Sequence, residues 1–344
     1  MPSPLRLTFD SDALVSNWRW LAGSSGRAAC GAAVKADGYG LGARGVVERL
    51  AAAGCRDFFV ATWAEAEALG EWPAELSLSV LHGVRAEDMA FALSHPARPV
   101  LNSVEQVNRW REAGGGACDV MVDSGMNRLG LSLTQAAGGA LDGLAIETLM
   151  SHLASADEPE RQMSRRQLEA FLPVATTVKA RRRSFANSAG ICLGQDYAFD
   201  LTRPGLALYG GVPHKAAAGH ILQVVRPEAQ VVQVREAKKG QTVGYGGTHK
   251  CKEDTRIAIL NIGYADGHLR GFSGTGRVLA GRAEMPVVGR VSMDLMAVDI
   301  GREAVSEGDW LPIDFDLPRA AAQSGLSQYE LLTSLGHRYQ RRWT

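Results

Sequence analysis

The sequence lacks long apolar runs, and it has no excess of charge of either sign. No stretch of its 344 residues approaches the roughly eighteen consecutive apolar residues of a membrane-spanning helix. Lysine plus arginine and aspartate plus glutamate number 37 each, so no net field favours nucleic acid or an anionic membrane as a partner. Polar and acidic residues occupy the place of a signal peptide's apolar core, so we expect a cytoplasmic protein.

Cysteine is also scarce, and its spacing excludes two common frameworks. The five cysteines are odd in number and scattered, and no C-x-x-C pair occurs. This pattern argues against a disulfide scaffold and against a structural zinc site, and we expect no metal. Glycine, in contrast, is abundant at 39 residues, which suits the many tight turns of repeated strand–helix units.

Short apolar runs alternate with segments of helical period over the first two-thirds of the chain. Eight strands separated by helices fit an α/β fold with an N-terminal (β/α)8 TIM-type barrel, which we expect to span residues 1–222. A doubly wound sheet is the alternative, but it normally needs fewer strands for this length. The predicted strands cover 28–34, 57–62, 76–83, 98–103, 118–124, 146–152, 182–188 and 199–205, and the helices cover 43–54, 63–72, 103–114 and 161–182.

The alternation of strand-like and helix-like segments stops at about residue 220. After it, runs rich in valine and isoleucine are broken by glycine turns. Such runs are typical of strands. Only 328–338 has a helical pattern. We therefore predict a second, mainly β-strand domain over residues 223–344.

Polar side chains gather at the carboxyl ends of the predicted barrel strands. Barrel enzymes build their active sites at this rim, and the loops after the seventh and eighth strands commonly hold phosphate. Small residues at 187–190 and 204–206 could bring backbone N–H groups close to an anion there. The polar residues at strand ends are Lys35, Asp123 with Arg128, His152, Asn187 with Ser188, and Arg203.

An amine beside a phosphate cradle is what pyridoxal 5'-phosphate (PLP) requires, because a lysine captures its aldehyde while the phosphate is anchored separately. Arg203 refines this hypothesis, since arginine is effectively never deprotonated and can only donate a hydrogen bond to the pyridine nitrogen. Taken singly, Lys35 also fits a surface lysine and His152 a core histidine. The arginines fit salt bridges, and Ser188 fits a helix cap. If all five residues had only these ordinary roles, their common position at the carboxyl ends of the barrel strands would be a coincidence.

Eight motifs in order give the chain a close resemblance to the alanine racemase family of fold-type III PLP enzymes. They stand here as AVKADGYGLG (33–42), VDSGMNRLG (122–130), SHLASADEP (151–159), ANSAG (186–190), TRPGLALYG (202–210), VGYGGTH (243–249), IGYADGHLR (262–270) and GRVSMD (289–294).

The resemblance implies a cofactor site in the barrel. Lys35 resembles the lysine that forms the Schiff base with PLP. Arg203 would face the pyridine nitrogen, and His152 would support Arg203. The implied phosphate contacts are Tyr39, Asn187, Ser188, Gly205 and Leu206.

The resemblance also implies a second base and a shared site. Tyr245 matches the second catalytic base, and the resemblance implies that Lys35 acts on the face of D-alanine and Tyr245 on the opposite face, that of L-alanine. Met293 would offer its N–H to the substrate carboxylate, with Asp294 beside it, and Tyr264 would narrow the entry corridor. In the family these four second-domain residues reach the site from the partner subunit, which implies a head-to-tail homodimer. Arg128 would lie near the cofactor's phenolic oxygen and the substrate carboxylate.

Three positions depart from the family pattern. Met121 stands where some members carry a carbamylated lysine that steadies the arginine, so Arg128 must find another anion or water. Gly244 precedes Tyr245 where serine is also common. His337, with Tyr339 close by, stands where some members have a tyrosine that touches the phosphate.

The leading hypothesis is a racemase of L- and D-alanine, serving cell-wall synthesis or D-alanine breakdown. The alternatives are a racemase of serine or of broader specificity, a non-catalytic PLP-binding barrel, and a decarboxylase. A decarboxylase would be expected to pair the pyridine nitrogen with a carboxylate, which Arg203 contradicts. The second domain, with Tyr245 and Asp294, argues against the non-catalytic barrel.

Overall fold

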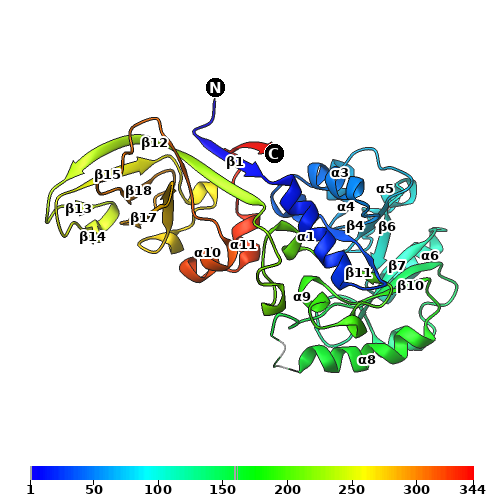
Figure 1. Ribbon diagram of the computed structural model, residues 1–344. Coiled ribbons are helices and arrows are strands. Elements are labelled where there is room, and N and C mark those ends of the chain that lie inside the picture. The colour runs from blue at the N-terminus through cyan, green and yellow to red at the C-terminus, as the bar shows by residue number, and fades with distance from the viewer. Residues whose placement is uncertain (1, 159, 161) are drawn as a thin grey trace. The chain divides into compact units, whose positions relative to one another are not determined.

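The chain folds into two compact units (Figure 1). A computed structural model describes residues 2–158, 160 and 162–344. One unit is Leu14–Leu222, and the other joins the segment up to Ala13 to Gln223–Thr344. The last residue of the predicted 151–159 motif and the first residue of the predicted 161–182 helix lie outside the described residues.

The unit Leu14–Leu222 is a nearly closed parallel barrel, as predicted. Strands β2 and β3 continue one another across Gly31, and they pair with β11 on one side and β4 on the other. A side chain at Gly31 would stand 2.7 Å from the Asp57 carbonyl oxygen, so glycine allows this close approach. The strands are β2 (Ala29–Cys30), β3 (Ala32–Ala33), β4 (Asp57–Val60), β5 (Ser77–Val80), β6 (Arg98–Leu101), β7 (Cys118–Asp123), β9 (Ile146–Met150), β10 (Arg182–Ser184) and β11 (Leu201–Thr202), with β8 (Leu131–Ser132) beside β7.

Amphipathic helices follow most of these strands, and Figure 1 shows α3 and α8 flanking the strands on different sides. Helix α3 buries Val46, Val47 and Leu50 and ends at Gly54, whose φ of 113° suits glycine. The helices are α1 (Ser11–Ser24), α2 (Lys35–Tyr39), α3 (Ala43–Ala53), α4 (Trp63–Ala68), α5 (Met89–Ser94), α6 (Val104–Glu112), α7 (Leu133–Ala137), α8 (Met163–Thr177) and α9 (Ser188–Ile191). No helix in the described part of the chain combines the length and the apolarity needed to cross a bilayer.

The second unit is mainly β-strand, also as predicted. Its sheet has the order β16-β17-β18-β15-β12-β1-β20, with β19 beside β12. Neighbours are antiparallel except β1 and β20. The strands are β1 (Leu5–Phe9), β12 (Val225–Ala237), β13 (Thr242–Val243), β14 (His249–Lys250), β15 (Thr255–Leu260), β16 (Arg277–Ala280), β17 (Ala283–Val288), β18 (Met296–Asp299), β19 (Trp310–Pro312) and β20 (Gln340–Trp343), and the helices are α10 (Leu317–Ser324) and α11 (Gln328–Thr333).

The structure differs from the sequence-based expectation at both ends of this unit. Strand β1, expected within residues 1–222 of the barrel, belongs to the second unit because it pairs with β12 and β20. Helix α10 was not expected. Its sequence signals are Asp316, whose side chain accepts the Arg319 N–H at 3.1 Å, and Gly325 at its end with φ 72°. Helix α11 is shorter than the predicted 328–338.

Candidate active site

Lys35 directly follows Val34 at the carboxyl end of β3, and a left-handed turn comes after it. The four residues Ala36, Asp37, Gly38 and Tyr39 have φ values of 52°, 51°, 62° and 55°. Left-handed backbone costs roughly 1–2 kcal/mol for each residue other than glycine. The turn is closed by backbone hydrogen bonds and by the Asp37 carboxylate, which accepts the Ala43 N–H at 2.8 Å. This backbone carries the Lys35 amine and the Tyr39 ring on one short, fixed segment.

The Lys35 amine is partly buried among cationic groups. Burial lowers its pKa most, and the charges of Arg128 and Arg203 lower it as well, whereas Glu65 acts in the opposite direction. Burial and nearby cations favour the neutral form of an amine. A lowered pKa makes this amine a better nucleophile and base near neutral pH than an exposed lysine.

Arg203 lies inside the barrel at the end of β11, with only 6% of its surface exposed. Its guanidinium donates to the Ser184 hydroxyl and, at 2.6 Å, to the Ser151 carbonyl oxygen. Burial lowers its pKa to about 10, so it stays charged at neutral pH. A fixed, charged donor therefore lies in the barrel.

His152 follows Ser151 at the end of β9, next to the residue that binds Arg203. Burial lowers its pKa to about 3, and the charges of Arg203, Arg128 and Lys35 contribute to the shift. The imidazole is therefore neutral, and it adds no charge beside the guanidinium. Its backbone carbonyl accepts a hydrogen bond of 2.9 Å from the Gln167 amide.

The predicted anion cradle forms where the loops after β10 and β11 meet. The Ser188 hydroxyl accepts the N–H groups of Gly205 at 2.9 Å and Ala207 at 3.3 Å. A side chain at position 205 would stand 2.2 Å from the Tyr39 hydroxyl, so glycine is needed for Tyr39 to reach this place. The structure thus brings together Tyr39, Ser188, Gly205 and the adjoining Leu206. Phosphate-binding sites in proteins are commonly built from small residues and backbone N–H groups.

Two predicted barrel residues have different local roles. Asn187 caps α9, because its side-chain oxygen accepts the Gly190 N–H at 2.9 Å. Arg128 lies exposed in the loop after β7, and among the described residues it makes no hydrogen bond or ion pair. Within the described residues, no protein carboxylate therefore binds Arg128 in place of a carbamylated lysine. Met121, which stands at the position of that lysine, is buried on β7.

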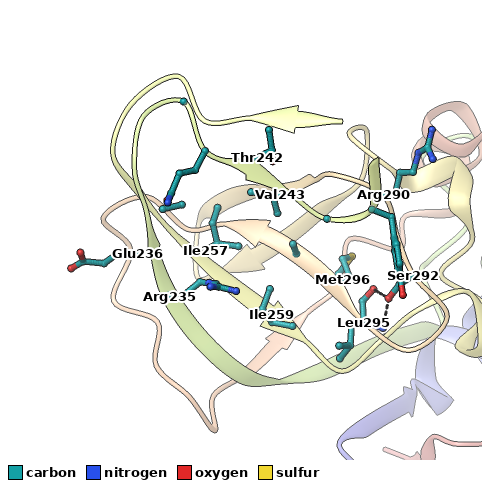
Figure 2. Close-up of a pocket in the computed structure, with 16 residues that line it drawn as sticks. Arg235, Glu236, Thr242, Val243, Ile257, Ile259, Arg290, Ser292, Leu295 and Met296 are labelled. Atoms are coloured by element: carbon teal, nitrogen blue, oxygen red, sulfur yellow. Dashed lines mark hydrogen bonds between the residues drawn. The ribbon is translucent and has the colours of Figure 1, made fainter. Parts of the chain in front are cut away.

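The remaining predicted residues lie on the second unit. Tyr245 begins a short 3-10 turn after β13 and is 73% exposed. It lines a pocket of about 810 Å³. Figure 2 shows Glu236 at one end of this pocket and Arg290 with Ser292 at the other, where the Ser292 hydroxyl donates to the Leu295 carbonyl oxygen at 2.7 Å. A side chain at Gly289 would stand 2.7 Å from the Val243 carbonyl oxygen, so this loop packs closely on the chain before Tyr245.

Tyr264, Met293 and Asp294 lie on two loops that are bonded backbone to backbone. The Tyr264 N–H donates to the Ser292 carbonyl at 3.0 Å, and the Ala265 N–H donates to the Met293 carbonyl at 3.1 Å. Met293 is 53% exposed, and the Arg270 guanidinium lies over the Tyr264 ring at 5.2 Å. One face of the second unit thus presents these side chains to its surroundings.

His337 and Tyr339, the two residues near the expected position of a phosphate-contacting tyrosine, differ in their exposure. His337 is exposed, whereas Tyr339 is buried within the second unit, and burial raises the pKa of its phenol. Sequence reasoning also missed two charged residues beside the site. Glu65 binds the backbone after Lys35, and Arg338 binds both Asp266 and Asp294. The only sequence signal for Glu65 is its place three residues after Thr62 at a helix start.

These groups fit a phosphorylated aldehyde. The lysine amine suits the aldehyde, the Ser188–Gly205 cradle suits the phosphate, and the buried guanidinium suits a neutral ring nitrogen. No group of three or more metal-ligating side chains occurs among the described residues. Fold and site therefore define a barrel protein that couples a lysine amine to a phosphorylated carbonyl compound. The chain belongs to the alanine racemase family: residues 9–213 match the alanine racemase N-terminal domain, and residues 224–343 match the C-terminal domain.

Individual relatives share the whole length of the chain. The biosynthetic alanine racemase of Agrobacterium fabrum is 41% identical over 99% of this chain and 94% of its own length. The catabolic alanine racemase of the same strain is 40% identical over 97% and 91%. Among solved structures, alanine racemase from Bartonella henselae with covalently bound pyridoxal phosphate has a TM-score of 0.92 and 34% identity, with both chains fully covered. The biosynthetic enzyme of Pseudomonas aeruginosa has a TM-score of 0.91 and 32% identity, again with full coverage.

Proposed function

We propose that this protein is a PLP-dependent alanine racemase that interconverts L- and D-alanine, with Lys35 and Tyr245 as its two bases. The observation that carries the proposal is the Lys35 amine, partly buried at the barrel rim among Arg128 and Arg203. Full-length similarity to curated alanine racemases supports the activity. Covalent attachment of the cofactor in the Bartonella henselae structure supports the role of a lysine.

The barrel holds the cofactor and orients it. PLP, when bound, supplies the aldehyde that Lys35 captures and a ring that withdraws electrons from the substrate's α-carbon. Tyr39, Ser188 and the backbone at Gly205 and Leu206 would hold the phosphate. Asn187 keeps this cradle in shape by capping α9.

Arg203 determines which chemistry follows. Its guanidinium stays charged and can donate a hydrogen bond to the ring nitrogen, but it does not give up its proton. The neutral His152 beside it leaves that charge unopposed. A ring nitrogen that accepts this hydrogen bond would stay unprotonated, and the ring would then be a weaker electron sink. This suits an α-proton that is removed and promptly returned.

The second unit supplies the other base in a homodimer. Tyr245 and Met293 are 73% and 53% exposed, which is unusual for large side chains unless another surface covers them. We infer that they enter the barrel site of a partner subunit, where Tyr245 holds or accepts the α-proton on the face opposite Lys35. Met293 would then offer its N–H to the substrate carboxylate, with Asp294 and Arg128 near it, and Tyr264 would narrow the entrance.

We also propose a cytoplasmic location, which the five unpaired cysteines support because thiols persist in a reducing compartment. The relatives include enzymes named both biosynthetic and catabolic, so either metabolic role fits this activity.

A substrate panel tests the function. The purified holoenzyme is given L-alanine, L-serine, L-lysine or L-arginine, and the D-product is followed with and without added PLP. We expect alanine to be racemised fastest and Lys35→Ala to abolish the product. Faster turnover of serine or of a basic amino acid would assign a different racemase. Failure of every substrate to exchange its α-hydrogen with solvent deuterium would support a non-catalytic barrel.

A further inference from the structure

Glu65 connects the ends of two neighbouring barrel strands. It lies in the first turn of α4, and its carboxylate is a double acceptor. Oε1 accepts the Ala36 N–H at 2.9 Å, and Oε2 accepts the Ala61 N–H at 2.6 Å. Ala36 directly follows Lys35 at the end of β3, and Ala61 directly follows β4. One side chain therefore fixes the backbone next to Lys35 to the adjacent strand.

Helix capping alone does not account for this arrangement. Thr62 is the N-cap of α4, and its hydroxyl accepts the Glu65 N–H at 3.2 Å. In a capping box the glutamate returns this bond to the N–H of the cap residue. Here the carboxylate binds the N–H groups of Ala61 and Ala36 instead. One of the two carboxylate oxygens of Glu65 thus binds the left-handed turn at 36–39, which we call the Lys35 loop.

The Lys35 loop needs such support because its backbone is strained. Three residues of the left-handed turn, Ala36, Asp37 and Tyr39, are not glycine. Each of them adopts a backbone conformation that side chains beyond glycine disfavour. Asp37 holds the exit of the turn through the Ala43 N–H, and Glu65 holds its entrance through the Ala36 N–H. A charge-assisted hydrogen bond is roughly twice as strong as a neutral one, so both carboxylates are suited to this task.

The charge of Glu65 matters as well. The charges of Arg128 and Arg203 lower the pKa of the Lys35 amine, whereas the Glu65 carboxylate raises it. Loss of Glu65 would leave these two cations without that opposing charge. The carboxylate therefore limits how far burial and the two arginines push the amine towards its neutral form.

We propose that Glu65 is a positioning residue for Lys35. It holds the entrance of the left-handed turn and balances the positive charge around the amine. This inference rests on the proposed function, in which Lys35 captures PLP and moves the α-proton.

The test compares Glu65→Gln and Glu65→Ala with the control Glu67→Gln, which changes an exposed glutamate of the same helix. The full-length protein is stripped of PLP, and the rate at which it recaptures PLP is measured against pH by visible absorbance. Loss of the anion should lower the pKa of the amine, so the midpoint of this profile should move to lower pH in both Glu65 variants.

Turnover provides the second readout. We expect kcat to fall about 100-fold in Glu65→Ala, because a reacting group displaced by about 1 Å loses roughly that factor in rate. Glu65→Gln keeps one amide acceptor, so its kcat should fall only about 10-fold. KM should change less than kcat in both variants. Glu67→Gln should match the wild type in both readouts. Glu65→Gln is nearly isosteric, so it decides the matter if Glu65→Ala does not fold.

The inference is overturned if the Glu65 variants keep the wild-type pH midpoint and kcat, even if their unfolding free energy falls. Such a result would leave Glu65 a purely structural residue. Failure of the proposed function has a different signature, since Lys35→Ala would then recapture PLP with unchanged absorbance.

Discussion

Arg338 holds the carboxylate of Asp266 with two hydrogen bonds of 2.6 Å each, from Nε and from Nη2. Its third donor, Nη1, binds Asp294 at 2.7 Å. Asp266 is fully buried, and it also accepts the Gly263 N–H at 3.0 Å. Arg338 therefore joins the loop of Tyr264 to the loop of Asp294, and both of these residues belong to the proposed substrate entrance.

Replacement of Arg338 should destabilise the second unit. Arg338→Ala leaves a buried carboxylate short of its donors, which costs about 2 kcal/mol, since water can reach the half-exposed position and replace part of the loss. Asp294→Asn disturbs only the exposed end of the network and should cost less than about 1 kcal/mol. Urea unfolding of both variants measures these values. Equal losses would show that the buried pair is not the main contribution.

Gly205 should be essential for cofactor affinity. A Cβ at this position would stand 2.2 Å from the Tyr39 hydroxyl, and overpacking of this kind costs about 1–3 kcal/mol. Gly205→Ala should therefore raise the dissociation constant of PLP about 10- to 100-fold, measured by absorbance titration of the stripped protein.

Two further variants check this explanation. Gly116→Ala adds the same methyl group where no atom lies within 4 Å, so PLP affinity should be unchanged. Tyr39→Phe removes the nearest clashing atom, so the added methyl group of Gly205→Ala should cost less PLP affinity in the Tyr39→Phe background than in the wild type. If Gly205→Ala binds PLP as tightly as the wild type does, Gly205 is not part of the phosphate cradle.

The sequence was sufficient to predict the barrel and the grouping at its rim. Parallel strands share one carboxyl edge, so residues placed at strand ends must meet there once the strand pattern is recognised. Lys35, Ser188, Arg203 and Gly205 follow this rule because each directly follows a strand or a short loop after one.

Other features depend on contacts that no local pattern encodes. Glycine marks most left-handed positions, but Ala36 and Asp37 adopt this conformation because the distant Glu65 carboxylate, the carboxylate of Asp37 itself and the barrel hold them there. Residues 5–9 were not predicted as a strand and lay within the expected barrel range, and only the pairing of β1 with β12 and β20 assigns them to the other unit. Glu65 looks like an ordinary helix-start residue until its bond to Ala36 is seen.

His268 should make the protein sensitive to acid. It is 3% exposed and stacks on Phe272 at 4.3 Å, and its Nε2 has no hydrogen-bond partner among the described residues. Burial lowers its pKa to about 3, against 6.5 as an ordinary value. Below pH 6.5 His268 therefore binds a proton in the unfolded chain but stays neutral in the folded chain. The folded state loses stability as the pH falls. This one group should account for about 2 kcal/mol between pH 7 and pH 5.

Urea unfolding at pH 7 and pH 5 tests this expectation in the wild type and in His268→Phe. The variant should lose about 2 kcal/mol less than the wild type on acidification, because it has no proton to bind at this position. Any constant change in packing cancels, since only the difference between the two pH values is compared. Equal acid losses would mean that His268 is already protonated in the folded protein.

Tyr245→Phe should separate the two faces of the reaction. The variant lacks only the phenolic hydroxyl, so kcat/KM should fall about 10²- to 10⁴-fold, the usual contribution of a positioned acid–base group. The fall must be equal in both directions, because the enantiomers have the same free energy. In heavy water, however, Lys35 should still exchange the α-hydrogen of D-alanine for deuterium, whereas L-alanine should keep its hydrogen.

Nuclear magnetic resonance of each enantiomer follows this exchange, and two variants serve as references. Tyr329→Phe changes a tyrosine of the same unit that is 45% exposed, and it should leave racemisation and exchange at wild-type rates. Lys35→Ala should abolish the exchange of both enantiomers. If Tyr245→Phe exchanges L-alanine as fast as D-alanine, the opposite base is another group, and the exposed Tyr245 must then serve the dimer surface alone.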